Sequence, residues 1–260
     1  MSSDRFFNQK LMKKLDRKLQ SVIDRVGADR KTLDEVFDKS TLLALEKLIS
    51  SKVIDILDFP ISTGKEGNVF RGVTPDKKFV AVKIYRTSTS TFKHISEYII
   101  GDPRFSSLPK NRRDVIFAWT QKEFKNLERL ARVGVSAPKP ITKIKNVLVM
   151  EYIGDEKRPA PALKDVKLDN PELMFNKLID LISIMYKKAE LVHSDMSAFN
   201  VLVHDNKPYL IDLGQGVLLE HPRSYEFLKR DIYNIVCYFR KFKIKSDEKQ
   251  IYMKITKEEW

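Results

Sequence analysis

The sequence contains a single cysteine, Cys237, among its 260 residues. One thiol excludes an intrachain disulfide and every cysteine-rich zinc site. Cys237 lies in the apolar run IYNIVCYF, which favours inert packing over a reactive thiol. Stability must therefore come from buried apolar side chains. With 42% hydrophobic residues, the chain is long enough for one two-lobed domain or two small ones.

Long hydrophobic runs are also missing. No segment approaches the roughly 20 apolar residues that cross a bilayer. The first residues, MSSDRFFNQKLMKK, lack the uninterrupted apolar stretch of a signal peptide. We therefore expect a cytoplasmic protein that has no membrane partner.

Acidic residues are fewer than basic ones, with 35 Asp and Glu against 48 Lys and Arg, which leaves a net charge of +13. The first 31 residues carry nine Lys or Arg and four Asp or Glu, and a second basic run, RKFKIK, occupies residues 240–245. This excess suits a polyanionic partner such as nucleic acid. Two solvated helix faces explain the same runs, so both interpretations stay open.

The spacing of apolar residues divides the chain into three parts. Helical spacing predicts an N-terminal helical extension over residues 1–52. Residues 53–150 read as an antiparallel meander, a long helix and two further strands. A Ser/Thr-rich insertion with weak periodicity, residues 86–111, interrupts this part, and we expect it to be partly mobile. The pattern of residues 151–260 predicts helices around one hairpin. Separate runs of strands and helices of this kind indicate an α+β fold.

Three polar residues surround the predicted hairpin of residues 201–212. Asp195 and Asn200 precede it in the segment HSDMSAFN, and Asp212 ends it. Because a hairpin returns its ends to one place, Asn200 and Asp212 can converge while Asp195 stays within reach on the preceding loop. Their oxygens suit Mg²⁺, and a nearby carboxylate can orient a nucleophile. Taken alone, each of these residues is equally typical of a turn.

Glycine is scarce, with nine residues, yet two of them fall in one turn. Gly64 and Gly67 lie in STGKEGNV between predicted strands, where their missing side chains let backbone N–H groups approach phosphate. A hairpin turn requires glycine for its own reasons as well. Lys83 follows in the apolar strand VAVK, where a charge is costly unless it meets a partner such as phosphate or a carboxylate.

Together these segments resemble the pattern of eukaryotic-type protein kinases. STGKEGNV resembles the glycine-rich loop, with Ser62 in place of its first glycine, and VAVK resembles the lysine motif. HSDMSAFN resembles the catalytic loop, and Asp212-Leu213-Gly214 resembles the metal-binding Asp-Phe-Gly motif. The exact sequences of these motifs, and the segment HPRSYEFLKRD that follows Asp212-Leu213-Gly214, are similar to those of the RIO family of atypical serine/threonine kinases. The similarity is greatest to the type-one branch and extends over about residues 55–240. The resemblance implies a two-lobed protein-kinase-like fold with a small antiparallel sheet lobe and a truncated helical lobe.

The resemblance also implies roles for individual residues. Catalysis would rest on Asp195, Lys83 and Asp212, with Asp195 acting on the hydroxyl proton. Asn200 and Asp212 would bind Mg²⁺, with Mn²⁺ as an alternative metal. Glu123 would pair with Lys83, and Glu128, which lies on a different face of the same predicted helix, is the lesser candidate. The contacts to ATP would come from Ser62, Gly64, Lys65, Gly67, Val69, Lys83, Glu123, Met150, Glu151 and Ile153.

The chain departs from ordinary protein kinases after Asp212, because 48 residues follow it and no Ala-Pro-Glu motif occurs among them. We therefore expect the usual platform for an extended peptide substrate to be missing. Phosphoryl transfer depends on positioning and charge stabilisation, which the remaining residues can still supply. Tethered hydroxyls gain in effective concentration. We thus expect autophosphorylation among Thr87, Ser88, Thr89, Ser90, Thr91, Ser106 and Ser107.

The expected function is a Mg-ATP-dependent serine/threonine kinase with autophosphorylation and ATPase activity. The resemblance implies a role in maturation of the small ribosomal subunit. The expected partners are ATP, a pre-small-subunit ribosomal particle or rRNA, and protein acceptors that include the chain itself. One alternative is a switch that binds pre-ribosomal RNA and whose ATP hydrolysis times its release. A small-molecule kinase of the aminoglycoside type is a further alternative, against which the STGKE form of the loop argues. Whether Asp212 accepts phosphate or serves as a metal ligand alone also stays open.

Overall fold

The computed structural model describes residues 37–64, 67–87, 92–105 and 111–260. The helices predicted before residue 37 lie outside the described residues. So do Lys65 and all the candidate phosphorylation sites except Thr87. The hydroxyl group of Thr87 donates to Asp38 at 2.7 Å.

The contacts divide the chain into two compact units. The first comprises Met1–Thr91, Arg112–Thr120 and Ile141–Tyr152. The second comprises Phe92–Asn111, Gln121–Pro140 and Ile153–Trp260. Residues 92–111, which the sequence analysis placed inside the sheet-containing part, therefore group with the second unit.

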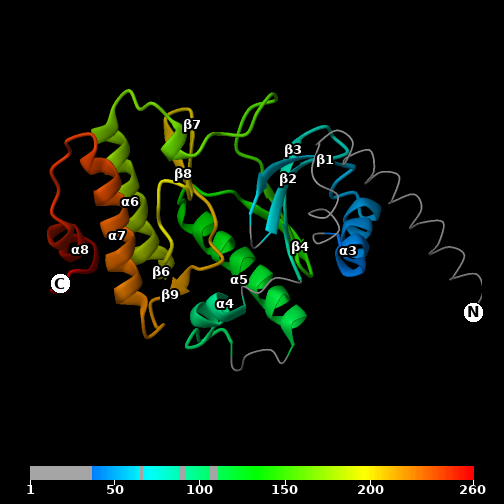
Figure 1. Ribbon diagram of the computed structural model, residues 1–260, viewed down its shortest axis with the longest axis horizontal. Coiled ribbons are helices and arrows are strands. Elements are labelled where there is room, and N and C mark those ends of the chain that lie inside the picture. Colours follow the sequence, from blue (N-terminus) through cyan, green and yellow to red (C-terminus); the bar gives the residue numbers. More distant parts are fainter. Residues whose placement is uncertain (1–36, 65–66, 88–91, 106–110) are drawn as a thin grey trace, which may run out of the picture. The chain divides into compact units, whose positions relative to one another are not determined.

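Helix α3 (Lys39–Ser50) confirms the helix expected at the end of the N-terminal extension. It begins after Asp38, whose side chain accepts a hydrogen bond from the backbone N–H of Thr41 at 2.8 Å. The apolar side chains of this helix, including Leu45 and Leu48, are buried in one core with the strands of the first unit. Figure 1 shows α3 beside these strands.

The sheet of the first unit has five strands in the order β1-β2-β3-β5-β4. The first three strands pair antiparallel in chain order, as the predicted meander requires. β3 also pairs antiparallel with β5 and is therefore interior to the sheet. The strands are β1 (Ile56–Thr63), β2 (Gly67–Val73), β3 (Phe79–Tyr85), β4 (Pro140–Ile144) and β5 (Val147–Glu151).

The insertion contains a helix that the sequence analysis missed. Helix α4 (Phe92–Ile99) buries Ile95, Tyr98 and Ile99, which recur at helical spacing. This helix has about two turns and follows five Ser and Thr residues, so its apolar pattern is too short to predict a helix from the sequence. Helix α5 (Arg112–Val133) follows, and it ends as predicted at Gly134, which adopts a φ of 76°.

Three further helices belong to the second unit: α6 (Pro171–Ala189), α7 (Ser224–Arg240) and α8 (Glu248–Thr256). Each contacts the other two, and Figure 1 shows them side by side. α6 begins as predicted after Asn170, whose side chain accepts from the backbone N–H of Leu173 at 2.9 Å. No helix within the described residues is both long and apolar enough to cross a membrane.

Two short strand pairs bring the polar segments of the second unit together. β7 (Val201–His204) and β8 (Lys207–Leu210) form the predicted hairpin, whose turn residues have positive φ angles, as Asp and Asn tolerate. β6 (Leu191–Val192) and β9 (Val217–Leu218) form a second antiparallel pair that was not predicted. A single 3-10 turn, Leu163–Asp165, precedes α6. The loops that carry Asp195 and Asp212 lie between these paired strands along the chain.

Candidate functional site

The structure brings two amide side chains to the carboxylate of Asp195. Oδ2 of Asp195 accepts hydrogen bonds from Nδ2 of Asn200 at 3.0 Å and from Nε2 of Gln215 at 3.2 Å. Nδ2 of Asn200 also donates to the backbone carbonyl of Asp195 at 2.8 Å. Because both acceptors lack a proton to give, the NH₂ group of Asn200 must face Asp195. Oδ1 of Asn200 is then available for another partner.

Asp212 lies near enough to Asp195 for the two charges to interact. Burial raises the pKa of Asp195, and the charge of Asp212 raises it further. Asp212 has a φ of 63°, a left-handed conformation that costs other side chains more than it costs Asp. Nε2 of the buried His193 donates to the backbone carbonyl of Ile211 at 3.0 Å, beside Asp212. His193 thus makes a structural contact between the two loops.

Helix α7 carries a buried acid to which the sequence analysis gave no role. Asp231 accepts from the backbone N–H groups of Ser194 and Met196, both at 2.8 Å. Burial raises its pKa to about 7, although these N–H donors act in the opposite direction. Arg230 donates to the carbonyl of Ser194, which holds a φ of 68°. The residues on both sides of Asp195 are therefore fixed by α7.

The sequence did contain a signal for Asp231. It lies three residues after Leu228 and four before Ile235, both of which are buried on the same face of α7. An acid on the apolar face of a helix is costly unless donors meet it, so this pattern indicates a polar partner. Gln215 carried no comparable signal, because its contact with Asp195 depends on the folded path of the loop.

The glycine-containing turn of the first unit is explained in part by the hairpin itself. The backbone N–H of Gly64 donates to the carbonyl of Gly67 at 2.9 Å and so closes the turn. A Cβ at Gly67 would lie 2.3 Å from the carbonyl oxygen of Ile84, so the neighbouring strand already requires glycine there. Ser62 and Val69 lie opposite each other on β1 and β2. A phosphate contact by this turn stays a prediction.

The other expected ATP contacts are divided between the units. Lys83 lies on β3, opposite Val69 and Leu148, with Nζ 4.9 Å from the centre of the Tyr85 ring. Met150 and Glu151 end β5, opposite Ala81 and Val80. In the second unit Glu123 is buried on α5, and the carbonyl of the buried Ile153 accepts from the N–H of Ala160 at 2.9 Å. Because Lys83 and Glu123 belong to different units, their pairing stays a prediction.

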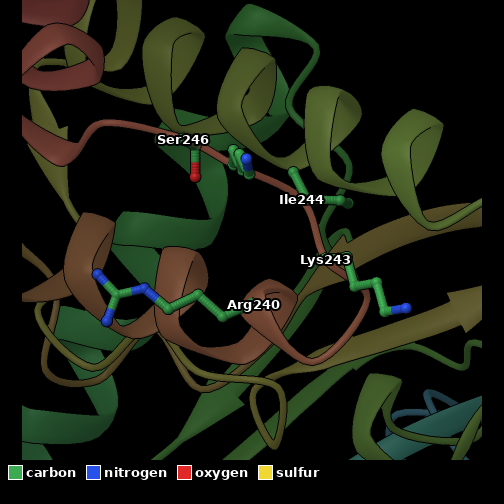
Figure 2. A pocket seen from close by; sticks show the side chains of 5 residues that line it. Arg240, Lys243, Ile244 and Ser246 are labelled. Atoms are coloured by element: carbon green, nitrogen blue, oxygen red, sulfur yellow. The ribbon is translucent and has the colours of Figure 1, made fainter.

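A separate hollow lies where α7 ends, and it has a volume of about 480 Å³. Figure 2 shows that its lining residues come from the end of α7 and from the extended segment after it. The lining residues are Arg240, Lys243, Ile244, Lys245 and Ser246. None of them belongs to the expected catalytic set, so this hollow is a basic surface feature apart from the Asp195 cluster. Among the described residues, no three His, Cys, Asp or Glu side chains gather as a metal site.

Comparisons with known proteins agree with these motifs. Residues 68–251 match the RIO domain family. The RIO-type serine/threonine-protein kinase Rio1 of Haloferax volcanii is 42% identical over 229 residues, which cover 88% of this chain and 79% of that protein. Rio1 of Thermoplasma acidophilum is 47% identical over 183 residues, 70% of this chain and 96% of that protein.

Solved structures confirm the predicted α+β, protein-kinase-like fold. The Rio2 kinase from Chaetomium thermophilum, in its ADP/Mg²⁺-phosphoaspartate complex, superimposes with a TM-score of 0.66 and 22% identity. The match covers 84% of this chain and 67% of that structure. With its matched domain and its Rio1 relatives, the chain belongs to the RIO family of serine/threonine protein kinases and is of the Rio1 type.

Proposed function

We propose that this kinase uses Mg-ATP and that its second unit supplies both the catalytic carboxylate and the metal ligands. Asp195 orients the attacking hydroxyl of a serine or threonine and takes its proton, while Asn200 and Asp212 bind the metal. The observation that supports this most directly is the convergence of Asn200 and Gln215 on Asp195, with Asp212 close enough to raise the pKa of that carboxyl. These are the groups that phosphoryl transfer requires.

The donor set fits a hard divalent cation such as Mg²⁺ or Mn²⁺. Both proposed ligands offer oxygen atoms, since the NH₂ group of Asn200 is turned toward Asp195. A cation would also relieve the repulsion between the carboxylates of Asp195 and Asp212. When bound, Mg²⁺ would neutralise charge on the phosphates.

The remaining contacts to ATP are proposed from the sequence motifs. Lys83 binds the α- and β-phosphates and pairs with Glu123. Adenine lies against Met150 and contacts the backbone of Glu151 and Ile153. For Ile153 we favour the N–H, because its carbonyl already accepts from Ala160. The phosphate loop contributes Ser62, Gly64, Lys65, Gly67 and Val69.

The acceptor of the phosphoryl group is proposed to include Asp212 as well as hydroxyl groups. A solved Rio2 structure of the same fold contains phosphoaspartate, which favours a carboxylate acceptor here. An oxygen of Asp212 would attack the γ-phosphorus as the bond to the bridging oxygen breaks and ADP leaves. Attack by water on the phosphorus would then release inorganic phosphate and restore the carboxylate, which amounts to ATPase activity.

A single-turnover reaction with γ-labelled ATP tests this proposal. We expect enzyme-bound label that hydroxylamine removes and that is absent from Asp212→Ala, because acyl phosphates react with hydroxylamine and phosphoserine does not. A matched control replaces the Ser and Thr residues of 86–111 by alanine. It should lose hydroxylamine-resistant label and keep the labile fraction. If only hydroxylamine-resistant label is found, Asp212 is not the acceptor. If Mg-ATP gives no phosphoryl transfer and no release of phosphate, the proposed function is overturned.

A second candidate function is RNA binding within small-subunit maturation, with ATP turnover timing release. The hollow at the end of α7 favours it, because the exposed Lys243 and Lys245 line it, together with Arg240, whose guanidinium also pairs with Glu248. Phosphate contacts release counterions, so the affinity for ribosomal RNA should fall steeply with salt.

We expect the double variant Lys243→Gln, Lys245→Gln to weaken RNA binding and to reduce the slope of log affinity against log salt by about 1 to 2. Filter binding or fluorescence anisotropy at several salt concentrations measures both quantities. Lys52→Gln, Lys167→Gln removes the same charge from two exposed lysines elsewhere and serves as the control. Equal slopes for the two double variants would show that the RNA does not contact the hollow.

A further inference from the structure

Helix α5 donates hydrogen bonds to the loop that follows Asp212. Nζ of Lys122 donates to the carbonyls of Gly214 and Gly216 at 2.8 and 2.6 Å. Nδ2 of Asn126 donates to the carbonyls of Leu213 and Gly216 at 2.7 and 2.8 Å. Two side chains one helical turn apart thus bind three carbonyls of this loop.

Burying the amine of Lys122 in α5 costs desolvation free energy. It is 1% exposed, and burial holds the pKa of its ammonium group well below the usual range. A buried amine is costly even when hydrogen-bonded, and an apolar side chain of similar length would be an easier choice for a helix core. Its two bonds to the loop give a reason for its presence.

Asn126 is held in the orientation that suits the loop. Nη1 of Arg104 donates to Oδ1 of Asn126 at 2.6 Å, so the NH₂ group of this amide must face the other way, toward the carbonyls. Arg104 is itself fixed by Asp102, whose buried carboxylate accepts from Nε at 2.8 Å and from Nη2 at 2.5 Å. The segment after α4 therefore orients Asn126.

The loop is in close contact with these donors. A Cβ at Gly216 would lie 2.9 Å from Nδ2 of Asn126 and 3.2 Å from the carbonyl of Leu213. The side chain of Gln215, between the two bound glycines, donates to Asp195. Asp212 begins the same loop with its left-handed φ of 63°. Holding the backbone of residues 213–216 thus fixes both Asp212 and Gln215.

We propose that Lys122 and Asn126 are positioning residues that hold residues 213–216 in the conformation in which Asp212 and Gln215 serve the catalytic centre. This inference rests on the proposed function, in which Asp212 binds the metal. A merely structural role would also lower stability when these residues are replaced. It would not change the local opening of the loop and the metal affinity together.

Hydrogen exchange in the nucleotide-free protein tests the first half of the proposal. Asn126→Asp keeps an acceptor for Arg104 and removes both donors to the loop. We expect backbone amides of residues 213–217 to exchange about tenfold faster in this variant and in Lys122→Met. Thr120→Val is the control, since it removes a buried hydroxyl of the same helix that bonds to the carbonyl of Ile116. Unchanged exchange in Asn126→Asp overturns the inference.

Binding of Mn²⁺ with ADP, followed by electron paramagnetic resonance, tests the second half. We expect Asn126→Asp to weaken Mn²⁺ binding about tenfold, with the thermal midpoint as a check on global stability. Gly216→Ala should give the same result from the loop side, and it replaces Lys122→Met if that variant does not fold. Faster exchange with wild-type Mn²⁺ affinity overturns the positioning role. If the wild type does not bind Mn²⁺-ADP, the proposed function is overturned. The hydrogen-exchange experiment then still tests whether α5 restrains residues 213–216.

Discussion

Asp195→Asn should lower phosphotransfer by about 10²- to 10⁴-fold while leaving the affinity for Mg-ATP nearly unchanged. An asparagine in this position cannot take the proton of the attacking hydroxyl. Its side-chain oxygen can still accept from Asn200 and Gln215, which donate to Oδ2 of Asp195 in the wild type, so the local geometry should survive. Single-turnover rates give the first quantity, and calorimetry with a non-hydrolysable ATP analogue and Mg²⁺ gives the second.

The complementary variants should behave in the opposite way. Lys83→Ala and Asp212→Asn should weaken Mg-ATP binding, because these residues are proposed to hold phosphate and metal. Asp205→Asn makes the same chemical change as Asp195→Asn in the exposed turn of the β7–β8 hairpin, and it should alter neither quantity. An equal loss of ATP affinity in all three site variants, each shown to be folded, would refute the division of roles.

Much of the local structure was predictable because neighbouring residues determine it. Helix α6 begins after Asn170 because the side chain of Asn170 accepts from a backbone N–H that has no partner within the helix. Helix α5 ends at Gly134 because glycine adopts a left-handed φ freely. The hairpin of residues 201–212 was recognisable from its turn, where Asp205 and Asn206 tolerate positive φ. That hairpin predicted that Asn200 and Asp212 converge with Asp195 within reach, and the hydrogen bond from Asn200 to Asp195 agrees with the second part of this prediction.

The remaining features depend on contacts between distant parts of the chain. β6 and β9 have two residues each, so no local pattern could indicate their pairing. Lys122 looks like an ordinary charged helix residue until the path of residues 213–216 is known. The glycine-containing turn has a structural reason of its own, because the adjacent carbonyl of Ile84 requires glycine at position 67 whether or not this turn approaches a phosphate.

The largest structural effect should come from Asp231→Asn. Both carboxylate oxygens of Asp231 accept a backbone N–H, from Ser194 and from Met196. Asparagine offers one acceptor, and its NH₂ group would face a backbone donor, whereas a carboxyl group keeps an acceptor on both oxygens even when it is protonated, because its O–H can turn away. We expect a loss of about 1–3 kcal/mol in the free energy of unfolding, together with at least a tenfold lower turnover, because the loop around Asp195 loses one anchor. Asp180→Asn, on the exposed side of α6, is the control and should change neither.

The pH dependence of this loss identifies the carboxyl group as its cause. Burial raises the pKa of Asp231 to about 7, above its ordinary value of 3.8. The folded chain therefore keeps the proton where the unfolded chain releases it, so the contribution of Asp231 to stability falls as pH rises from about 4 to about 7. Asp231→Asn lacks this titration, and the difference in unfolding free energy between wild type and variant should shrink over that range. Urea unfolding at several pH values measures the difference. A constant or growing difference would show that Asp231 is already ionised in the folded chain, stabilised by the N–H groups of Ser194 and Met196 on either side of Asp195.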